Sequence, residues 1–134
     1  MFEECGLKKG DKVALCSRNQ ANWVVSFLAA MTYGAVPVPL MHEFKPSSIN
    51  HLVNHSEAKI LFVDEVIWEG LSEIDMSDLQ AIIQVNTFKL LYAANDKIAD
   101  SREHLNELFG KHYPMEFDAD SLNYYEDSAD ELAI

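Results

Sequence analysis

Glycine is scarce in this chain, with 5 residues among 134, and none of them stands in a Gly-x-Gly-x-x-Gly, Walker or Gly-x-Ser-x-Gly pattern. Such patterns supply the backbone amides that bind phosphates, or hold a nucleophilic serine on a sharp turn. The sequence therefore lacks a phosphate-binding loop and a serine-hydrolase elbow. No residue of the chain is predicted to be catalytic, to bind a cofactor or to ligate a metal.

Basic residues are also few, because 10 Lys and Arg side chains face 22 Asp and Glu side chains, a formal charge of −12 at pH 7. Residues 1–99 hold 12 acidic and 8 basic side chains, whereas residues 100–134 hold 10 and 2, so most of the excess negative charge lies in the last part of the chain. Attraction to phosphates dominates nucleic-acid affinity, and here it is replaced by repulsion. The charge therefore argues against a nucleic-acid partner.

Cysteine is limited to Cys5 and Cys16, without a Cys-x-x-Cys pair or a histidine at metal-ligand spacing. This usage is typical of free thiols in a reducing compartment, so a cytoplasmic location is expected. The longest apolar stretch, residues 21–38, is interrupted by polar residues and falls short of the roughly 20 apolar residues of a membrane span. No basic region precedes an apolar one at the start, so no signal peptide is expected.

Apolar sequence is sufficient for one domain with a sizeable core, because 49% of the residues are hydrophobic. Short apolar runs of strand length alternate with longer segments of helical length. This alternation predicts a three-layer α/β fold with a mostly parallel sheet and helices on both faces. Parallel strands are expected near residues 12–17, 36–39, 59–63 and 81–85, and helices near residues 20–33 and 46–56.

The helix expected at residues 20–33 has a capping candidate in Asn19 and a stop signal in Gly34. It is apolar on almost every side, and we therefore expect it to be buried. The residues expected in the core are Trp23, Phe27, Leu28, Leu52, Ile60, Phe62 and Ile82.

Two further helices are expected after the third and the fourth strand, and the pattern weakens beyond residue 86. A short helix is expected over Glu65–Ile74, and another over Asp100–Phe109, whose first residues form a capping-box pattern. Acidic residues then alternate with aromatic ones without a clear period, which favours an extended surface segment. The chain is therefore divided into an α/β unit, residues 1–112, and an acidic extended segment, residues 113–134.

Histidines approach metal-ligand spacing without completing it. His51 and His55 are four residues apart on an expected helix, but the glutamate that follows the first histidine of a zinc-protease motif is missing. His104 and His112 have no cluster of cysteines or carboxylates that points to a common centre. All four are interpreted as solvent-facing side chains, and no metal site is predicted.

Residues 59–65, Lys-Ile-Leu-Phe-Val-Asp-Glu, are similar to the first strand of bacterial receiver domains, where acidic residues at the strand end bind magnesium. A receiver also needs a phosphate-accepting aspartate after an apolar strand roughly 45 residues later, and the sequence around Phe109 offers no such strand. This interpretation is therefore disfavoured, and Asp64 is predicted to cap a helix.

A more specific resemblance is carried by three segments in order. They are Gly6–Leu15 (Gly-Leu-Lys-Lys-Gly-Asp-Lys-Val-Ala-Leu), Asn19–Trp23 (Asn-Gln-Ala-Asn-Trp) and Tyr33–Leu40 (Tyr-Gly-Ala-Val-Pro-Val-Pro-Leu). They resemble the Gly-Asp-x-Val-Ala strand, the helix with an early aromatic residue and the Gly-Ala-x-x-x-Pro-Leu turn of the adenylate-forming (AMP-binding) superfamily. A proline-led helix from Pro46 and a strand over Ser56–Leu61 continue the similarity, which covers residues 6–64.

This resemblance implies a parent protein that is an acyl-CoA synthetase, of the long-chain fatty acid–CoA ligase type. In this family a carboxylate attacks the α-phosphate of ATP with Mg present, which gives acyl-adenylate and pyrophosphate, and coenzyme A then displaces AMP. The resemblance thus implies ATP, Mg and coenzyme A as cofactors of the parent and a small-molecule carboxylic acid as its substrate. The acyl chain length stays open.

Asp130–Ile134 resembles the strand that, in this family, runs into the phosphate-binding loop. That loop, the adenine-binding segment, the ribose-binding aspartate and the catalytic lysine have no counterpart in the 134 residues. We therefore expect an amino-terminal fragment that is a scaffold, is inactive alone, and binds neither ATP nor AMP. Surface that the rest of the parent would cover is expected to make it self-associate. The alternative is a non-catalytic acidic α/β interaction module.

Overall fold

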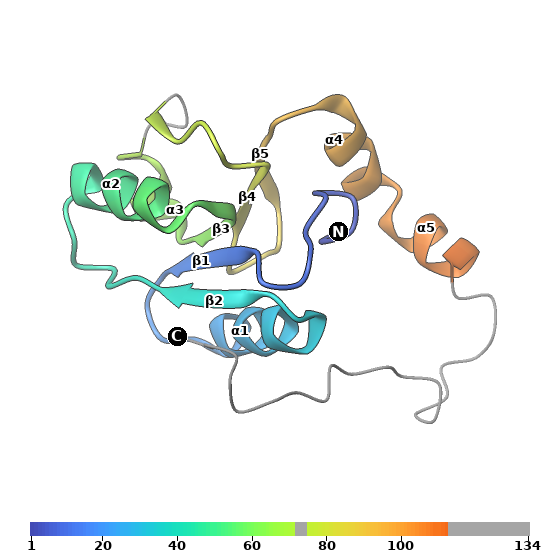
Figure 1. Cartoon of the computed structure of the whole chain (residues 1–134), viewed down its shortest axis with the longest axis horizontal. Coiled ribbons are helices and arrows are strands. Elements are labelled where there is room, and N and C mark those ends of the chain that lie inside the picture. Colours follow the sequence, from blue (N-terminus) through green and yellow to red (C-terminus); the bar gives the residue numbers. More distant parts are fainter. Residues whose placement is uncertain (72–74, 113–134) are drawn as a thin grey trace.

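Five strands form one sheet in the computed structural model, which describes residues 1–71 and 75–112 (Figure 1). They are β1 (Lys12–Cys16), β2 (Val36–Pro39), β3 (Ala58–Val63), β4 (Ala81–Gln84) and β5 (Leu90–Ala93). Their order across the sheet is β2-β1-β3-β4-β5. β1 pairs in parallel with β2 and β3, β3 pairs in parallel with β4, and β5 runs antiparallel to β4. The four predicted parallel strands are confirmed to within one residue at each end, and β5 was not predicted.

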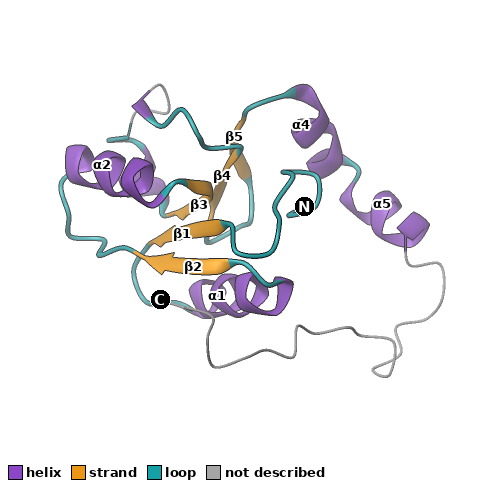
Figure 2. Cartoon of the chain, viewed as in Figure 1, coloured by secondary structure: helices purple, strands orange, loops and turns teal. Residues whose placement is uncertain are grey.

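Helices cover both faces of this sheet (Figure 2). They are α1 (Ala21–Tyr33), α2 (Pro46–Ser56), α3 (Glu65–Trp68), α4 (Asp96–Glu103) and α5 (Leu105–His112). Side chains of α1 and α4 share a hydrophobic cluster with the N-terminal segment, and side chains of α2 and α3 share the cluster on the opposite face. This arrangement confirms the predicted three-layer α/β fold.

The central strands are buried on both sides, which explains their uninterrupted apolar runs. In β1, Val13 and Leu15 belong to the cluster beneath α1, while Ala14 and Cys16 belong to the cluster beneath α2. All four side chains are fully buried. Alternate side chains of a strand point to opposite faces, so a strand that is covered on both faces must be apolar throughout. The two prolines of β2 are tolerated because this strand lies at an edge of the sheet.

α1 is less buried than its sequence predicts. Its fully buried residues are Ser26 and Ala30, and the exposed fractions of Val24, Val25, Leu28 and Met31 lie between 40% and 53%. The prediction that Leu28 is a core residue is therefore wrong. A helix in an outer layer buries only the side that faces the sheet, whatever the composition of its other side.

The other core predictions divide into buried and half-buried residues. Ile60, Phe62 and Ile82 are buried, whereas Trp23, Phe27 and Leu52 are half-buried. Trp23 and Phe27 still contribute to the core, since their rings stack with centroids 5.3 Å apart and pack against the cluster beneath α1.

The two ends of α1 compare differently with the prediction. The N-cap residue is Gln20 rather than Asn19, and its side chain makes no capping hydrogen bond. Gly34 ends the helix as predicted, with a φ of 86° in the left-handed region that favours glycine. Its amide donates to the carbonyl oxygens of Ala30 and Met31, which would otherwise lack helical partners.

The chain after β4 is organised differently from the prediction. α4 begins at Asp96, and Oδ1 of Asn95 caps it by accepting a hydrogen bond from the amide of Ile98 at 3.1 Å. The expected helix start at Asp100 is wrong, because Asp100 lies inside α4. The Asn95 cap has already started the helix one turn earlier.

α3 is shorter than the helix expected over Glu65–Ile74, since it ends at Trp68. Residues 72–74 and the acidic segment 113–134 lie outside the described residues. Within the described ranges, no helix combines the length and the apolar character needed to cross a bilayer.

Candidate functional site

The strand order reverses beside β1, and open α/β sheets place their ligand sites at such a reversal. The chain leaves β1 through α1 to β2 on one side and returns through α2 to β3 on the other. The loops after β1 and β3 therefore separate at the carboxyl edge of the sheet, which is the usual position of a binding crevice. The polar residues that follow these strands, Ser17 to Gln20 and Asp64, form the candidate site.

The carboxylate of Asp64 holds these two loops together. Its Oδ2 accepts a hydrogen bond from the amide of Arg18 at 2.8 Å, and its Oδ1 accepts one from Nε2 of Gln20 at 2.9 Å. Asp64 occupies the N-cap position of α3, but its side chain makes no capping hydrogen bond. The prediction that Asp64 caps a helix is right about the position and wrong about the interaction, because both carboxylate oxygens have partners in the loop after β1.

A second polar contact ties α1 to the end of β4. Nδ2 of Asn22 donates to the carbonyl oxygens of Val85 and Asn86, at 3.0 and 2.9 Å. Both carbonyl groups directly follow β4, so the first turn of α1 is held at the same carboxyl edge. Hydrogen bonds of Asp64 and Asn22 therefore connect the segment that follows β1 with the segments that follow β3 and β4.

These contacts suit a structural role better than catalysis or nucleotide binding. Oγ of Ser17 donates to the carbonyl oxygen of Arg18 at 2.9 Å, and both oxygens of Asp64 are engaged. A triphosphate needs convergent donors and positive charge, whereas the amide of Arg18 and the side-chain amide of Gln20 already serve the Asp64 carboxylate. These two donors are therefore engaged within the chain.

Both cysteines are free thiols, as predicted, and both are buried. Cys5 lies in the cluster beneath α1 and Cys16 in the cluster beneath α2, so the sheet separates them. Burial is the main cause that raises the pKa of each thiol from 9.0 to about 11, with the amino terminus opposing it at Cys5 and Asp64 adding to it at Cys16. Neither thiol is therefore a nucleophile at neutral pH, since the thiolate is the reactive form.

The histidines do not assemble a metal site. The rings of His51 and His55 stack with centroids 6.1 Å apart on the exposed side of α2. His104 is exposed, and its pKa is raised first by the hydrogen bond of Nδ1 with the carbonyl oxygen of Asp100 and then by the Asp100 carboxylate. His112 is the last residue of α5. In residues 1–71 and 75–112, no three His, Cys, Asp or Glu side chains lie close enough to hold a metal ion.

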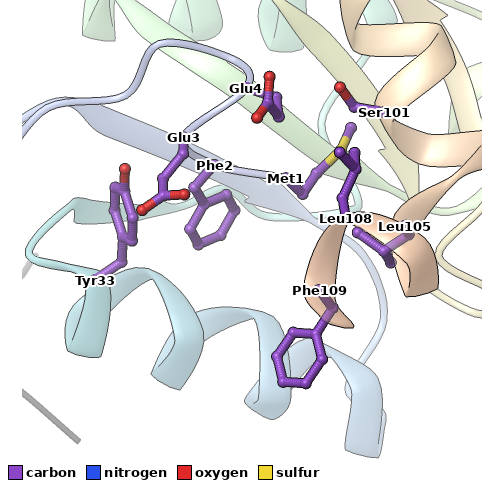
Figure 3. Close-up of a pocket in the computed structure, with 9 residues that line it drawn as sticks. All are labelled: Met1, Phe2, Glu3, Glu4, Tyr33, Ser101, Leu105, Leu108 and Phe109. Atoms are coloured by element: carbon purple, nitrogen blue, oxygen red, sulfur yellow. The ribbon is translucent and has the colours of Figure 1, made fainter. Parts of the chain in front are cut away.

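A cavity of about 340 Å³ opens between the N-terminal segment, the end of α1 and the α4–α5 pair (Figure 3). Its lining includes Phe2, Tyr33 and Leu105, and the Phe2 and Tyr33 rings meet edge to face with centroids 5.3 Å apart. Its charged residues are Glu3, Glu4 and Met1, the last through the amino terminus. The Glu4 carboxylate is paired with Nζ of Lys97 at 3.1 Å.

The contact between Gln20 and Asp64 is the feature of this site that sequence reasoning missed. Both residues closely follow neighbouring parallel strands, and the carboxyl ends of such strands meet at one edge of a sheet. Their positions after two strands could have indicated the contact, but only if the sequence had also shown that β1 and β3 are neighbours in the sheet.

The strand order and the placement of the helices define the class of this chain. It is an open, doubly wound α/β unit whose four parallel strands, β1 to β4, end at a shared carboxyl edge. The family model described as "AMP-binding enzyme" matches residues 1–125. The chain therefore belongs to the AMP-binding enzyme family, in agreement with the resemblance seen in its sequence.

Similar proteins include acyl-CoA ligases from distant organisms. Fatty acyl-CoA synthetase A of Dictyostelium discoideum is 32% identical over 98 residues, which cover 73% of this chain and 14% of that protein. 4-Hydroxybutyrate–CoA ligase 2 of Metallosphaera sedula is 32% identical over 69 residues, which cover 52% of this chain and 13% of that protein. A solved long-chain-fatty-acid–CoA ligase from Archaeoglobus fulgidus has a TM-score of 0.57 at 26% identity, covering 63% of this chain and 17% of that one. The chain thus spans a small share of the length of its relatives.

Proposed function

We propose that this chain is the amino-terminal α/β scaffold of an acyl-CoA synthetase and that it has no ligase activity alone. In the longer protein, a carboxylic acid attacks the α-phosphate of ATP with Mg present, giving acyl-adenylate and pyrophosphate, and coenzyme A then displaces AMP. Positive charge from the metal and from a phosphate-binding loop would stabilise the developing negative charge. The described residues of this chain position the loops at the carboxyl edge of the sheet and take no direct part in the reaction.

The observation that carries this proposal is the family match over residues 1–125, taken with the small share of each relative that the chain spans. A segment of 13–14% leaves most of such a ligase, and hence most of its binding residues, to the rest of the protein. The contact between Asp64 and Gln20 supports the same view, since these side chains bind each other. The family match also favours a ligase over a non-catalytic interaction module.

A long-chain fatty acid is the proposed substrate of the longer protein. A fatty acyl group stands in the name of the Dictyostelium relative, and a long-chain fatty acid in that of the Archaeoglobus structure. The name of the Metallosphaera relative specifies 4-hydroxybutyrate, a small hydroxy acid. Small hydroxy acids are therefore the competing substrate class, and an experiment must compare the two.

A cytoplasmic location is part of the proposal. Cys5 and Cys16 are free thiols, which is the usual state of cysteine in a reducing compartment. Fractionation of cells that produce the tagged full-length protein should recover it in the cytosolic fraction. Recovery from the culture medium would contradict this part of the proposal.

The scaffold role is tested by calorimetric titration of the 134-residue chain with ATP and, separately, with AMP. No saturable heat is expected, because the chain carries a net charge of −12 and the donors at its carboxyl edge are engaged by Asp64. The full-length protein, titrated under the same conditions, is the positive control. Saturable micromolar binding by the 134-residue chain would show that this chain itself contains a nucleotide site, which would refute the scaffold role.

The ligase activity is tested by exchange of labelled pyrophosphate into ATP with the full-length protein. Exchange should require a carboxylic acid, and long-chain fatty acids should support it better than 4-hydroxybutyrate. A fatty alcohol of matched length is the control, since it lacks the carboxylate that attacks ATP. No exchange with any acid would refute the ligase proposal, whereas a preference for 4-hydroxybutyrate would refute only the long-chain substrate.

A further inference from the structure

A groove formed by α1, the sheet, the N-terminal segment and the α4–α5 pair carries positive charge on a largely apolar lining. It encloses about 350 Å³, and its lining includes Phe62 and Ile83 of the sheet and Arg102 of α4. It is called the Arg102 groove below. The charged residues of its described lining are Arg102 and Met1, the latter through the amino terminus. No acidic residue belongs to this described lining, although the chain carries a net charge of −12.

The guanidinium of Arg102 is only partly engaged within the chain. Its Nε donates a hydrogen bond of 3.0 Å to the carbonyl oxygen of Phe88. Among residues 1–71 and 75–112, neither Nη atom of Arg102 has a hydrogen-bond or ion-pair partner. Arg102 is half-buried, so water solvates its charge less completely than it solvates an exposed side chain. A guanidinium in this state favours an anion that supplies oxygen acceptors to the two Nη atoms.

The backbone at Phe88 shows that this guanidinium is held in place. Phe88 has a φ of 54°, in the left-handed region that residues with a side chain rarely adopt. The hydrogen bond from Arg102 holds its carbonyl oxygen, and its ring meets that of Phe62 edge to face. Strained backbone that is maintained by distant contacts is concentrated at ligand sites. The cation of the groove is therefore positioned before any ligand arrives, which reduces the entropic cost of binding.

Three phenylalanine rings of the lining favour an aromatic ligand. The ring of Phe62 meets those of Phe2 and Phe88 edge to face, with centroids 6.3 and 6.5 Å apart. A flat ring in the groove can continue this edge-to-face pattern, and a guanidinium also stacks on aromatic faces. A volume of about 350 Å³ lies near the lower end of the range for ligand pockets. The groove therefore suits a compact ligand of one or two rings.

The same lining does not suit a nucleotide. Oγ of Ser26 donates to the carbonyl oxygen of Asn22, and Oγ1 of Thr87 donates to Oε1 of Gln84, each at 2.8 Å. Ribose hydroxyls and adenine nitrogen atoms would therefore face mostly apolar side chains, and buried polar groups without partners are costly. A single guanidinium matches one carboxylate rather than a chain of phosphates. The chemistry of the groove thus points to an aromatic acid with one negative charge.

We propose that the Arg102 groove binds a compact aromatic monocarboxylate. The Nη atoms of Arg102 donate to the carboxylate, and the aromatic ring lies among Phe2, Phe62 and Phe88. This site shares no residue with the candidate site around Asp64. The proposal concerns the 134-residue chain itself and does not rest on the ligase activity of a longer protein, so each of the two can fail without the other.

Equilibrium dialysis of the 134-residue chain against naphthoate and, separately, against naphthamide tests the need for negative charge. The two probes share one ring system and nearly the same shape, but the amide is neutral. Naphthoate should bind at least about tenfold more tightly, because hydrogen bonds between a guanidinium and a carboxylate are stronger than neutral ones. The net charge of −12 acts in the opposite direction, since it repels an anion that meets no local cation. Equal affinities, or tighter binding of naphthamide, would overturn the proposal.

Octanoate separates recognition of a ring from the general binding of apolar acids. It carries the same carboxylate on a flexible chain that has no ring. It should bind at least about threefold more weakly than naphthoate, because it cannot make edge-to-face contacts and loses more rotamer freedom on binding. Octanoate that binds as tightly as naphthoate would refute the aromatic class of the ligand.

Arg102→Gln tests whether this guanidinium is the cation that binds the probe. The substitution should weaken naphthoate binding at least about tenfold and change naphthamide binding by less than about twofold, because only the carboxylate loses a charged partner. Lys45→Gln is the matched control, since Lys45 is exposed at the start of α2, which packs on the opposite face of the sheet. This variant should bind naphthoate like the wild type. A folded Arg102→Gln variant that binds naphthoate as tightly as Lys45→Gln would contradict the assignment.

A second variant keeps the test decisive if Arg102→Gln does not fold. Ala29 is exposed on α1 and lines the groove, so Ala29→Phe fills the space of the ligand without changing the core. It should weaken the binding of naphthoate and naphthamide alike, each at least about tenfold. Ala21→Phe is the control, because Ala21 is exposed at the first position of α1 and lies outside the described lining. If both variants bind naphthoate equally well, the ligand does not lie in the Arg102 groove.

Discussion

Nε2 of Gln20 donates a hydrogen bond of 2.9 Å to Oδ1 of Asp64, and this contact joins the loops after β1 and β3 at the point where the strand order reverses. The same carboxylate accepts a hydrogen bond from the amide of Arg18. The contact also explains why Gln20 does not cap α1, since its side-chain amide is directed to the carboxylate across the sheet edge. Hydrogen bonds to the Asp64 carboxylate therefore fix the position of the loop after β1 at this edge of the sheet.

Removal of this carboxylate should lower the stability of the domain. Asp64→Ala leaves the amide of Arg18 and the side chain of Gln20 without their acceptor, and we expect a loss of about 1–2 kcal/mol in the free energy of unfolding. Urea unfolding followed by circular dichroism measures the change. Glu69→Ala is the control, because Glu69 is an exposed carboxylate at the end of the same short helix. Equal free energies of unfolding for the two variants would mean that the hydrogen bonds of Asp64 do not contribute to stability.

The parallel part of this fold was predictable because its signals are local. The apolar runs of β1 and β3 are as long as the strands, and Pro46 stands at the first turn of α2. Gly34 follows α1 directly and takes the left-handed conformation that its position requires. Each of these features is decided within a few residues of the chain, so the pattern alone identifies it.

The features that were missed depend on distant partners. Leu28 belongs to a helix that is apolar on almost every side, and periodicity cannot say which side faces the sheet. β5 has four half-buried residues and exists through its antiparallel pairing with β4. Gln20 and Asp64 are 44 residues apart, and only the order of the strands brings them together. The exposure of Leu28, the formation of β5 and the contact at the candidate site therefore all depend on tertiary packing.

A matched pair of valine substitutions tests the assignment of core and surface. Val63 in β3 is fully buried and Val66 in α3 is exposed. Val63→Ala should lower the free energy of unfolding by about 1.5–3 kcal/mol, because it removes buried methyl groups and leaves a cavity. Val66→Ala should leave stability unchanged or raise it slightly, since alanine is the better helix former. Urea unfolding of both variants measures the difference, and similar losses would refute the assignment.

A matched pair of glycine substitutions tests the end of α1. Gly34 has a φ of 86°, so Gly34→Ala forces an L-residue into the left-handed region, with an expected cost of about 1–2 kcal/mol. Gly110 lies inside α5, and a Cβ added there meets no atom within 4 Å. Gly110→Ala should therefore stabilise the chain by up to about 1 kcal/mol. Thermal unfolding should move in opposite directions for the two variants, and a shift in the same direction would contradict this account.

The buried thiols should make the stability of the chain fall at alkaline pH. Burial raises the pKa of Cys5 and Cys16 to about 11 in the folded chain, from an ordinary value of 9.0. Above pH 9 the unfolded state releases thiol protons that the folded state still holds, so the free energy of unfolding decreases with rising pH. The contribution of the neutral thiols is complete below pH 9 and is lost as the pH rises toward 11.

The double variant Cys5→Ala and Cys16→Ala retains every Lys and Tyr that titrates in this range but lacks both thiols. In urea unfolding at a series of pH values, its free energy of unfolding should fall less steeply above pH 9 than that of the wild type. Parallel slopes would show that the thiols ionise alike in the folded and unfolded chains, whatever the difference in absolute stability.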